Sequence, residues 1–97
     1  MDKITLLSLS NDLKRIVTSI QRGSLENSKR FSIEAKRWIT QIRDKDDEYL
    51  KKLLQKIDAT LDKKDDLEKA ENCLMYSVLT QNKALYSPNH QNAPTRR

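Results

Sequence analysis

The sequence is poor in the residues that build tight turns, cross-links and aromatic clusters. Its 97 residues include one glycine, two prolines and one cysteine, and aromatic residues make up only 5% of the chain. Sheet proteins need many turns and are enriched in aromatic and β-branched residues, so this composition favours helices. The single cysteine, Cys73, cannot form a disulfide within the chain, which indicates a reducing compartment.

Long apolar runs are also missing. No stretch approaches the roughly 18 apolar residues of a membrane span. The first residues, MDKITLLSLSNDLKR, lack the uninterrupted apolar segment and the small-residue cleavage site of a secretory signal. We therefore expect a cytoplasmic protein without a transmembrane segment.

Residues suited to catalysis or metal binding are scarce. The only histidine, His90, lies in a polar C-terminal stretch far in sequence from Cys73, so a Cys–His nucleophile is not expected. One cysteine and one histidine cannot supply the four ligands of a structural zinc site. The acidic groups DKDDE and DKKDDLE lack the glycine and the residue order of an EF-hand loop. We predict no enzyme, metal site or cofactor, and we expect Cys73 to be a buried apolar residue.

Apolar residues recur at helical spacing in four segments. Leu6, Leu9, Leu13 and Ile16 mark the first of them. The pattern predicts an all-α protein, a small antiparallel four-helix bundle within one domain over residues 1–86. The tail, residues 87–97, has two prolines and no apolar run and is predicted to be disordered. The four predicted helices cover about residues 2–22, 25–43, 45–62 and 66–85.

Helix boundaries are marked by capping residues. Gly23 suits a left-handed C-terminal cap, and Ser24 suits the next N-cap, where its hydroxyl would accept a backbone hydrogen bond. Asp44 is a candidate cap for the third helix. Asp65 and Glu68 have the spacing of a capping box at the start of the fourth.

One alternative joins the second and third helices into a single rod. No glycine or proline lies between Ser24 and Asp62, and the apolar phase continues from Ile42 to Leu53. A rod of this length, roughly 57 Å at 1.5 Å per residue, would require a dimer. The break is favoured, because the rod would place the carboxylate of Asp46 in the apolar stripe.

Charge is distributed unevenly. Residues 1–43 carry nine Lys and Arg against four Asp and Glu, whereas residues 44–86 carry eight against ten. At 100° per residue the basic residues of the second helix form two adjacent rows opposite its apolar side. These rows are a candidate face for an anionic partner such as nucleic acid, but a solvated surface or pairing with the acidic starts of the third and fourth helices would look the same. The rows contain Arg22, Lys29, Arg30, Lys36, Arg37 and Arg43.

The fourth segment has the broadest apolar band, so it is expected to be the most buried helix. Its margins, together with the only tryptophan, are the candidate apolar interface. As the principal hypothesis, we predict a non-catalytic interaction or regulatory module whose partner is a second copy of the chain, with a dimer favoured among homo-oligomers, or another protein. Nucleic-acid binding through the basic rows is the alternative. The candidate apolar interface comprises Trp38, Met75, Tyr76 and Leu79.

Overall fold

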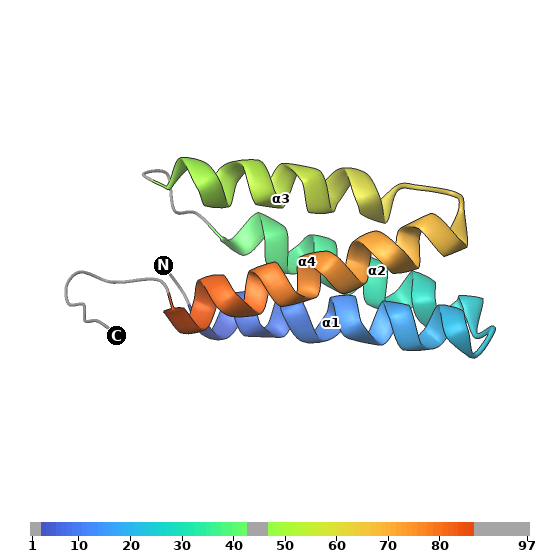
Figure 1. Cartoon of the computed structure of the whole chain (residues 1–97). Coiled ribbons are helices and arrows are strands. Elements are labelled where there is room, and N and C mark those ends of the chain that lie inside the picture. Colours follow the sequence, from blue (N-terminus) through green and yellow to red (C-terminus); the bar gives the residue numbers. More distant parts are fainter. Residues whose placement is uncertain (1–2, 43–46, 87–97) are drawn as a thin grey trace.

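The computed structural model describes residues 3–42 and 47–86, and these residues form an all-α bundle. Each helix runs antiparallel to the one before it (Figure 1). The predicted antiparallel four-helix bundle is therefore confirmed, while the predicted disordered tail, residues 87–97, lies outside the described residues. The helices are α1 (Lys3–Gln21), α2 (Leu25–Gln41), α3 (Glu48–Leu61) and α4 (Asp66–Tyr86).

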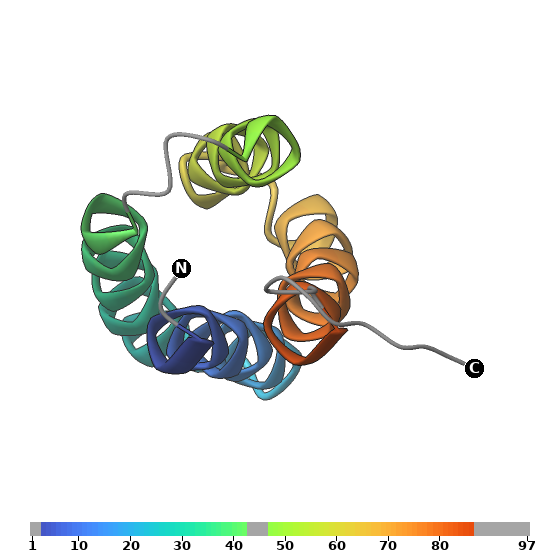
Figure 2. The ribbon, with the colours of Figure 1, turned by 90° about the vertical axis from the view of Figure 1, so that its left-hand side faces the viewer.

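The four helices lie in a ring in the order of the chain, so that α4 returns to the side of α1 (Figure 2). α1 packs extensively against both α2 and α4, whereas α3 has much smaller contacts with its two neighbours. Among the helices of residues 3–42 and 47–86, none is long and apolar enough to cross a membrane.

α2 and α3 are separate helices, so the single-rod alternative is wrong. Ile42 caps the end of α2 with extended backbone, and its N–H donates to the carbonyl oxygens of Trp38 and Ile39. The predicted cap Asp44 lies outside the described residues. Asp47 caps α3 instead, because its Oδ1 accepts a hydrogen bond of 3.0 Å from the Leu50 N–H.

The turn between α1 and α2 closes as the sequence predicts. Gly23 has a φ of 75°, a left-handed conformation that costs glycine little, and its N–H donates to the Ile20 carbonyl at 3.0 Å. Ser24 occupies the N-cap of α2, but its hydroxyl accepts no hydrogen bond from the first turn, so that part of the prediction is wrong. The ψ of Ser24, 77°, lies below the usual β-region of a capping residue.

The start of α4 carries the predicted aspartate cap. Asp65 Oδ1 accepts from the N–H groups of Leu67 and Glu68, at 3.0 and 3.2 Å. The carboxylate of Glu68 lies 3.2 Å from Lys63 Nζ in an exposed ion pair. α3 and α4 therefore both begin with a carboxylate that satisfies backbone donors.

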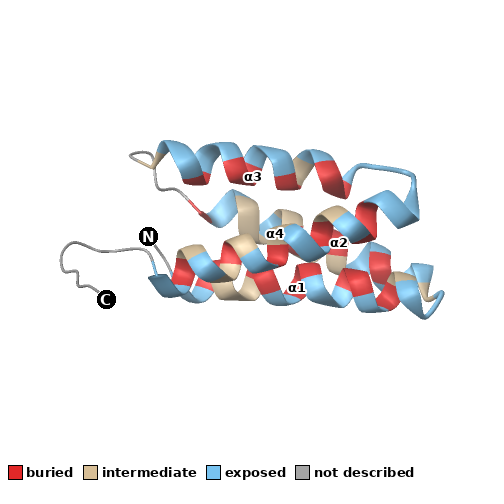
Figure 3. Ribbon diagram, in the orientation of Figure 1, coloured by how far each residue is buried: buried red, intermediate tan, exposed pale blue. Residues whose placement is uncertain are grey.

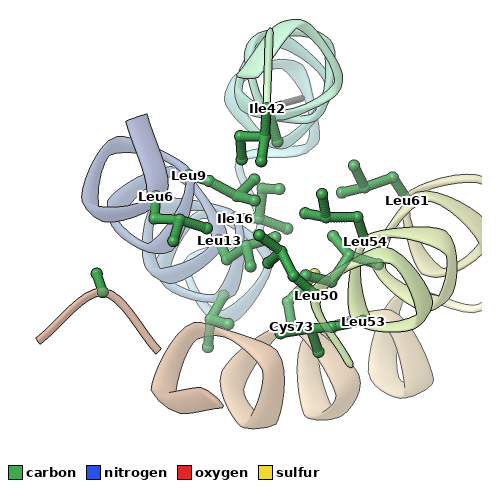
Figure 4. Packing of buried hydrophobic residues seen from close by; sticks show 14 residues of the cluster. Leu6, Leu9, Leu13, Ile16, Ile42, Leu50, Leu53, Leu54, Leu61 and Cys73 are labelled. Carbon is green, nitrogen blue, oxygen red and sulfur yellow. The ribbon is translucent and has the colours of Figure 1, made fainter. Parts of the chain in front are cut away.

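The core is built mainly from leucines and isoleucines of α1 and α3 that meet in the centre of the ring (Figure 4). Leu6, Leu9, Leu13 and Ile16 of α1 are fully buried. The expectation that the fourth helix is the most buried is wrong, because α4 turns its small residues inward and leaves large ones outside. The buried residues of α4 include Ala70, Cys73, Ser77, Thr80 and Ala84.

Small inward residues let α4 approach α1 closely. The Ser10 hydroxyl on α1 donates a buried hydrogen bond of 2.7 Å to the Ser77 carbonyl oxygen. Bulky side chains at these α4 positions would push the two helices apart. Hydrophobicity alone would favour burial of the side of α4 that carries the leucines. Close packing against α1 instead requires the side with small residues to be buried.

Candidate functional site

The predicted basic rows lie on the outer side of α2. Arg22, which precedes the helix, and Lys29, Arg30 and Arg37 within it are exposed, and none of them forms an ion pair with another described residue. Arg43, the last member of the rows, lies outside the described residues. The rows therefore present four exposed cations that no residue in the described part of the chain pairs.

Lys36 is different, because it connects α2 to α3. Its Nζ lies 2.7 Å from Asp62 Oδ1 and 3.4 Å from Asp58 Oδ1. The hydrogen bond to Asp62 raises the pKa of Lys36, and burial opposes this effect. One member of the basic rows is thus paired within the bundle. The sequence suggests pairing with the acidic starts of the third and fourth helices, but the partners of Lys36 lie at the end of α3 and on the residue after it.

Trp38, a candidate interface residue, is held between α2 and α1. Its indole Nε1–H donates to Asp12 Oδ2 at 2.8 Å, and the other carboxylate oxygen of Asp12 lies 3.1 Å from Arg15 Nη1. Asp12 is 1% exposed. Burial raises the pKa of Asp12, and the bonds from Trp38 and Arg15 oppose this. The indole is therefore a structural contact of the bundle, as expected for a core tryptophan with a satisfied N–H.

The other three candidates divide between two sides of α4. Tyr76 and Leu79 are half-buried and pack against the core. Met75 is exposed. It adjoins a line of large apolar side chains that runs the length of α4 and remains between 44% and 70% exposed. We call this line the α4 stripe: Leu67, Leu74, Val78 and Leu85.

The α4 stripe keeps one angular position on the helix, because its members are separated by seven, four and seven residues. Figure 3 shows exposed segments along the outer side of α4. The first half of the stripe borders a groove of about 320 Å³ between α1 and α4. Apolar residues of both helices line it: Val17, Ile20, Leu67, Ala70 and Leu74.

The stripe and its groove are features that the sequence interpretation did not identify. The signal was present in the spacing of Leu67, Leu74 and Leu85. These residues belong to the apolar band that the sequence predicts to be buried, because periodicity shows that residues share a face and does not show which face is buried.

Chemically reactive groups are few in the described part of the chain. Cys73 is fully buried, and burial raises the pKa of its thiol to about 11. It therefore packs as an apolar residue, as predicted. Within residues 3–42 and 47–86 no three His, Cys, Asp or Glu side chains are grouped so that they could hold a metal ion. His90 lies outside the described residues.

Comparison with models of protein families, with curated proteins and with solved structures finds no match to this chain.

Proposed function

We propose that this protein is a non-catalytic interaction module that forms a homodimer through the α4 stripe. The observation that supports the proposal is the line of large apolar side chains left exposed along one helix. Contiguous apolar surface of this kind marks interaction sites in small proteins. The expected place of action is the cytoplasm, where the single thiol of Cys73 stays reduced.

Self-pairing fits the order of side chains along the stripe. In an antiparallel pair of α4 helices related by a two-fold axis, Leu67 faces Leu85 of the partner subunit, and Leu74 faces Val78 of the partner subunit. Each apolar side chain then meets an apolar one. The groove between α1 and α4 gives the Leu85 side chain of the partner subunit a recess beside Leu67.

Charge favours the antiparallel direction. Glu71 lies within the line of the stripe, is exposed and forms no ion pair with another described residue. A parallel pair would bring the two Glu71 carboxylates together, which is unfavourable. An antiparallel pair brings Glu71 to Gln81 of the partner subunit, and Gln81 already accepts a hydrogen bond of 2.7 Å from Lys14. The carboxylate then meets an amide and an ammonium group.

The test is the molar mass of the protein in solution, measured by light scattering coupled to gel filtration. We expect a dimer at tens of micromolar and a monomer for the double variant Leu74→Glu, Val78→Glu, because paired carboxylates would face each other across the axis. Ile33→Glu is the matched control, since Ile33 is 64% exposed on α2, away from the stripe. A monomeric wild-type protein, or a dimer that the double variant leaves intact, would contradict the proposal.

Nucleic-acid binding is the second candidate function, and the four unpaired cations of the basic rows are the observation that favours it. No aromatic side chain interleaves with these cations to stack on bases, and Lys36 is engaged by two carboxylates. A triple variant of Lys29, Arg30 and Arg37 to Gln tests it, with circular dichroism as the control for folding. Loss of salt-sensitive binding to an oligonucleotide would support this function.

A further inference from the structure

A pocket lies at the turn that joins α1 to α2, away from the α4 stripe. Its volume is about 370 Å³, within the range of pockets that take small molecules. Side chains of both helices and of the turn contribute to it, and no Asp or Glu is among the residues that line it. Its lining includes Arg15, Ser19, Arg22, Ser24, Asn27 and Phe31.

The first turn of α2 has open backbone donors beside this pocket, which Ser24 and Asn27 line. The N–H groups of Leu25, Glu26 and Asn27 have no hydrogen-bond partner among the described residues, and the Ser24 side chain does not cap them. The contrast with α3 and α4 is clear, because Asp47 and Asp65 supply carboxylates at the same position of those helices. An anion bound at the start of α2 would accept hydrogen bonds from the backbone N–H groups of its first turn, as these carboxylates do in α3 and α4.

A second observation is independent of the helix end. Ser19 is only 7% exposed and lines the pocket, yet its hydroxyl has no hydrogen-bond partner among the described residues. Its backbone carbonyl is used by the Ser24 N–H at 2.8 Å, which fixes Ser19 beside the start of α2. Buried hydroxyls without a partner are uncommon in native proteins, and a bound acceptor would satisfy this one.

Two guanidinium groups make the pocket positive. Arg22 is exposed and forms no ion pair within the described part of the chain. Arg15 is held by Asp12 through Nη1 at 3.1 Å, and its guanidinium lies 5.7 Å from the centre of the Phe31 ring. The single bond to Asp12 leaves other N–H groups of Arg15 available. Guanidinium groups match the geometry of phosphate oxygens, because their N–H donors form a planar fork.

From these contacts we infer that the pocket at the α1–α2 turn binds a phosphate monoester. The terminal oxygens of the phosphate accept from the backbone N–H groups of the α2 start, from Arg22 and from the Ser19 hydroxyl. The organic part of the ligand lies against Phe31, the apolar wall of the pocket. The site does not involve the α4 stripe, so phosphate binding and dimerisation can be tested independently of each other.

The test uses phenyl phosphate as the probe, added to ¹⁵N-labelled protein at constant ionic strength and followed by NMR. We expect the amide signals of Leu25, Glu26 and Asn27 to shift in a saturable way. Phenol, which lacks the phosphate, should leave them in place, and inorganic phosphate should bind more weakly than phenyl phosphate. Shifts that are absent, or that fall on Lys29, Arg30 and Arg37 instead, overturn the inference.

Two variants sharpen the test. Ser24→Asp places a carboxylate at the start of α2, so it should keep the helix folded and weaken phenyl phosphate at least tenfold. Arg22→Gln should weaken binding about tenfold, since it removes one charge-assisted hydrogen bond. Arg30→Gln is the matched control, because Arg30 is exposed on α2 and does not line the pocket. Unchanged affinity in both Ser24→Asp and Arg22→Gln overturns the inference.

Two further probes identify the source of the phosphate. Vesicles that contain phosphatidic acid carry a monoester on a lipid, and binding that phenyl phosphate displaces would assign the ligand to a membrane surface. Absence of vesicle binding, with phenyl phosphate still bound, assigns it to a soluble phosphorylated molecule. An oligonucleotide without a terminal phosphate offers only diesters, and displacement of phenyl phosphate by it at equal affinity overturns the monoester assignment.

Discussion

α1 packs extensively against α2 and α4, whereas α3 meets α2 and α4 over much smaller contacts. The polar bonds of the two regions differ in the same way. Asp12 and Trp38 join α1 to α2 through a hydrogen bond to a buried carboxylate. Lys36 joins α2 to α3 through ion pairs whose side chains are between about a third and two thirds exposed. The contact between α1 and α2 therefore includes a buried polar bond, whereas the ion pairs between α2 and α3 are screened by water.

The largest expected difference between the two regions lies in their leucines. Leu13→Ala in α1 should lower the free energy of unfolding by about 2–5 kcal/mol, because Leu13 is fully buried and its loss leaves a cavity. Leu54→Ala in α3 should fall at the lower end of that range, since the side chain keeps slight exposure and α3 has fewer neighbours to hold a cavity open. Denaturant unfolding followed by circular dichroism measures both, and a larger loss for Leu54→Ala would reverse the comparison.

The second prediction concerns the buried carboxylate of α1. Asp12→Ala leaves the Trp38 N–H without its acceptor and should cost about 1–3 kcal/mol of folding stability. Asp58→Ala, at a half-exposed position of α3, is the control and should cost less. The fluorescence of Trp38, the only tryptophan, follows both unfolding transitions. Equal losses of folding stability in the two variants would mean that the polar contacts of α1 and of α3 contribute equally to the stability of the bundle.

The pH dependence of Asp12 has a definite sign. Burial raises its pKa in the folded state above the ordinary 3.8, so folding favours the protonated carboxyl. The contribution of Asp12 to stability is therefore full below pH 3.8 and is lost as pH rises through the folded pKa. Relative to Asp12→Asn, which does not titrate, the wild-type protein should lose stability over that window. Asp47 acts oppositely, because its lowered pKa gives stability above pH 3.8 that is lost as pH falls through its folded pKa.

The sequence predicts the helices well, because Gly23 and Asp65 are local signals that act within one turn of the chain. It does not predict which side of α4 is buried. That choice depends on Ser77 and its close approach to Ser10, a contact between distant parts of the chain. The pocket at the α1–α2 turn was missed for a similar reason, since Ser24 looks like an ordinary cap and its open backbone donors appear only in three dimensions.

The smallest expected change in the free energy of unfolding is that of a substitution at Lys36, which forms exposed ion pairs between α2 and α3. Lys36→Gln should cost about 0.2–1 kcal/mol at low salt, because exposed ion pairs are screened by water, and the loss should shrink as salt is added. The hydrogen bond to Asp62 raises the pKa of Lys36, so this stabilisation is complete below pH 10.5 and is lost as pH rises through the folded pKa.

Lys29→Gln is the matched control for this pair, since Lys29 lies on the same basic face without an ion pair to another described residue. Urea titrations of both variants at low and high salt separate the pair from the general charge of the face; guanidinium chloride would itself screen it. If Lys36→Gln lost as much folding stability as Asp12→Ala, the ion pairs between α2 and α3 would stabilise the protein as much as the buried hydrogen bond between α1 and α2. A loss equal to that of Lys29→Gln would mean that the ion pairs of Lys36 do not help to hold α3 against α2.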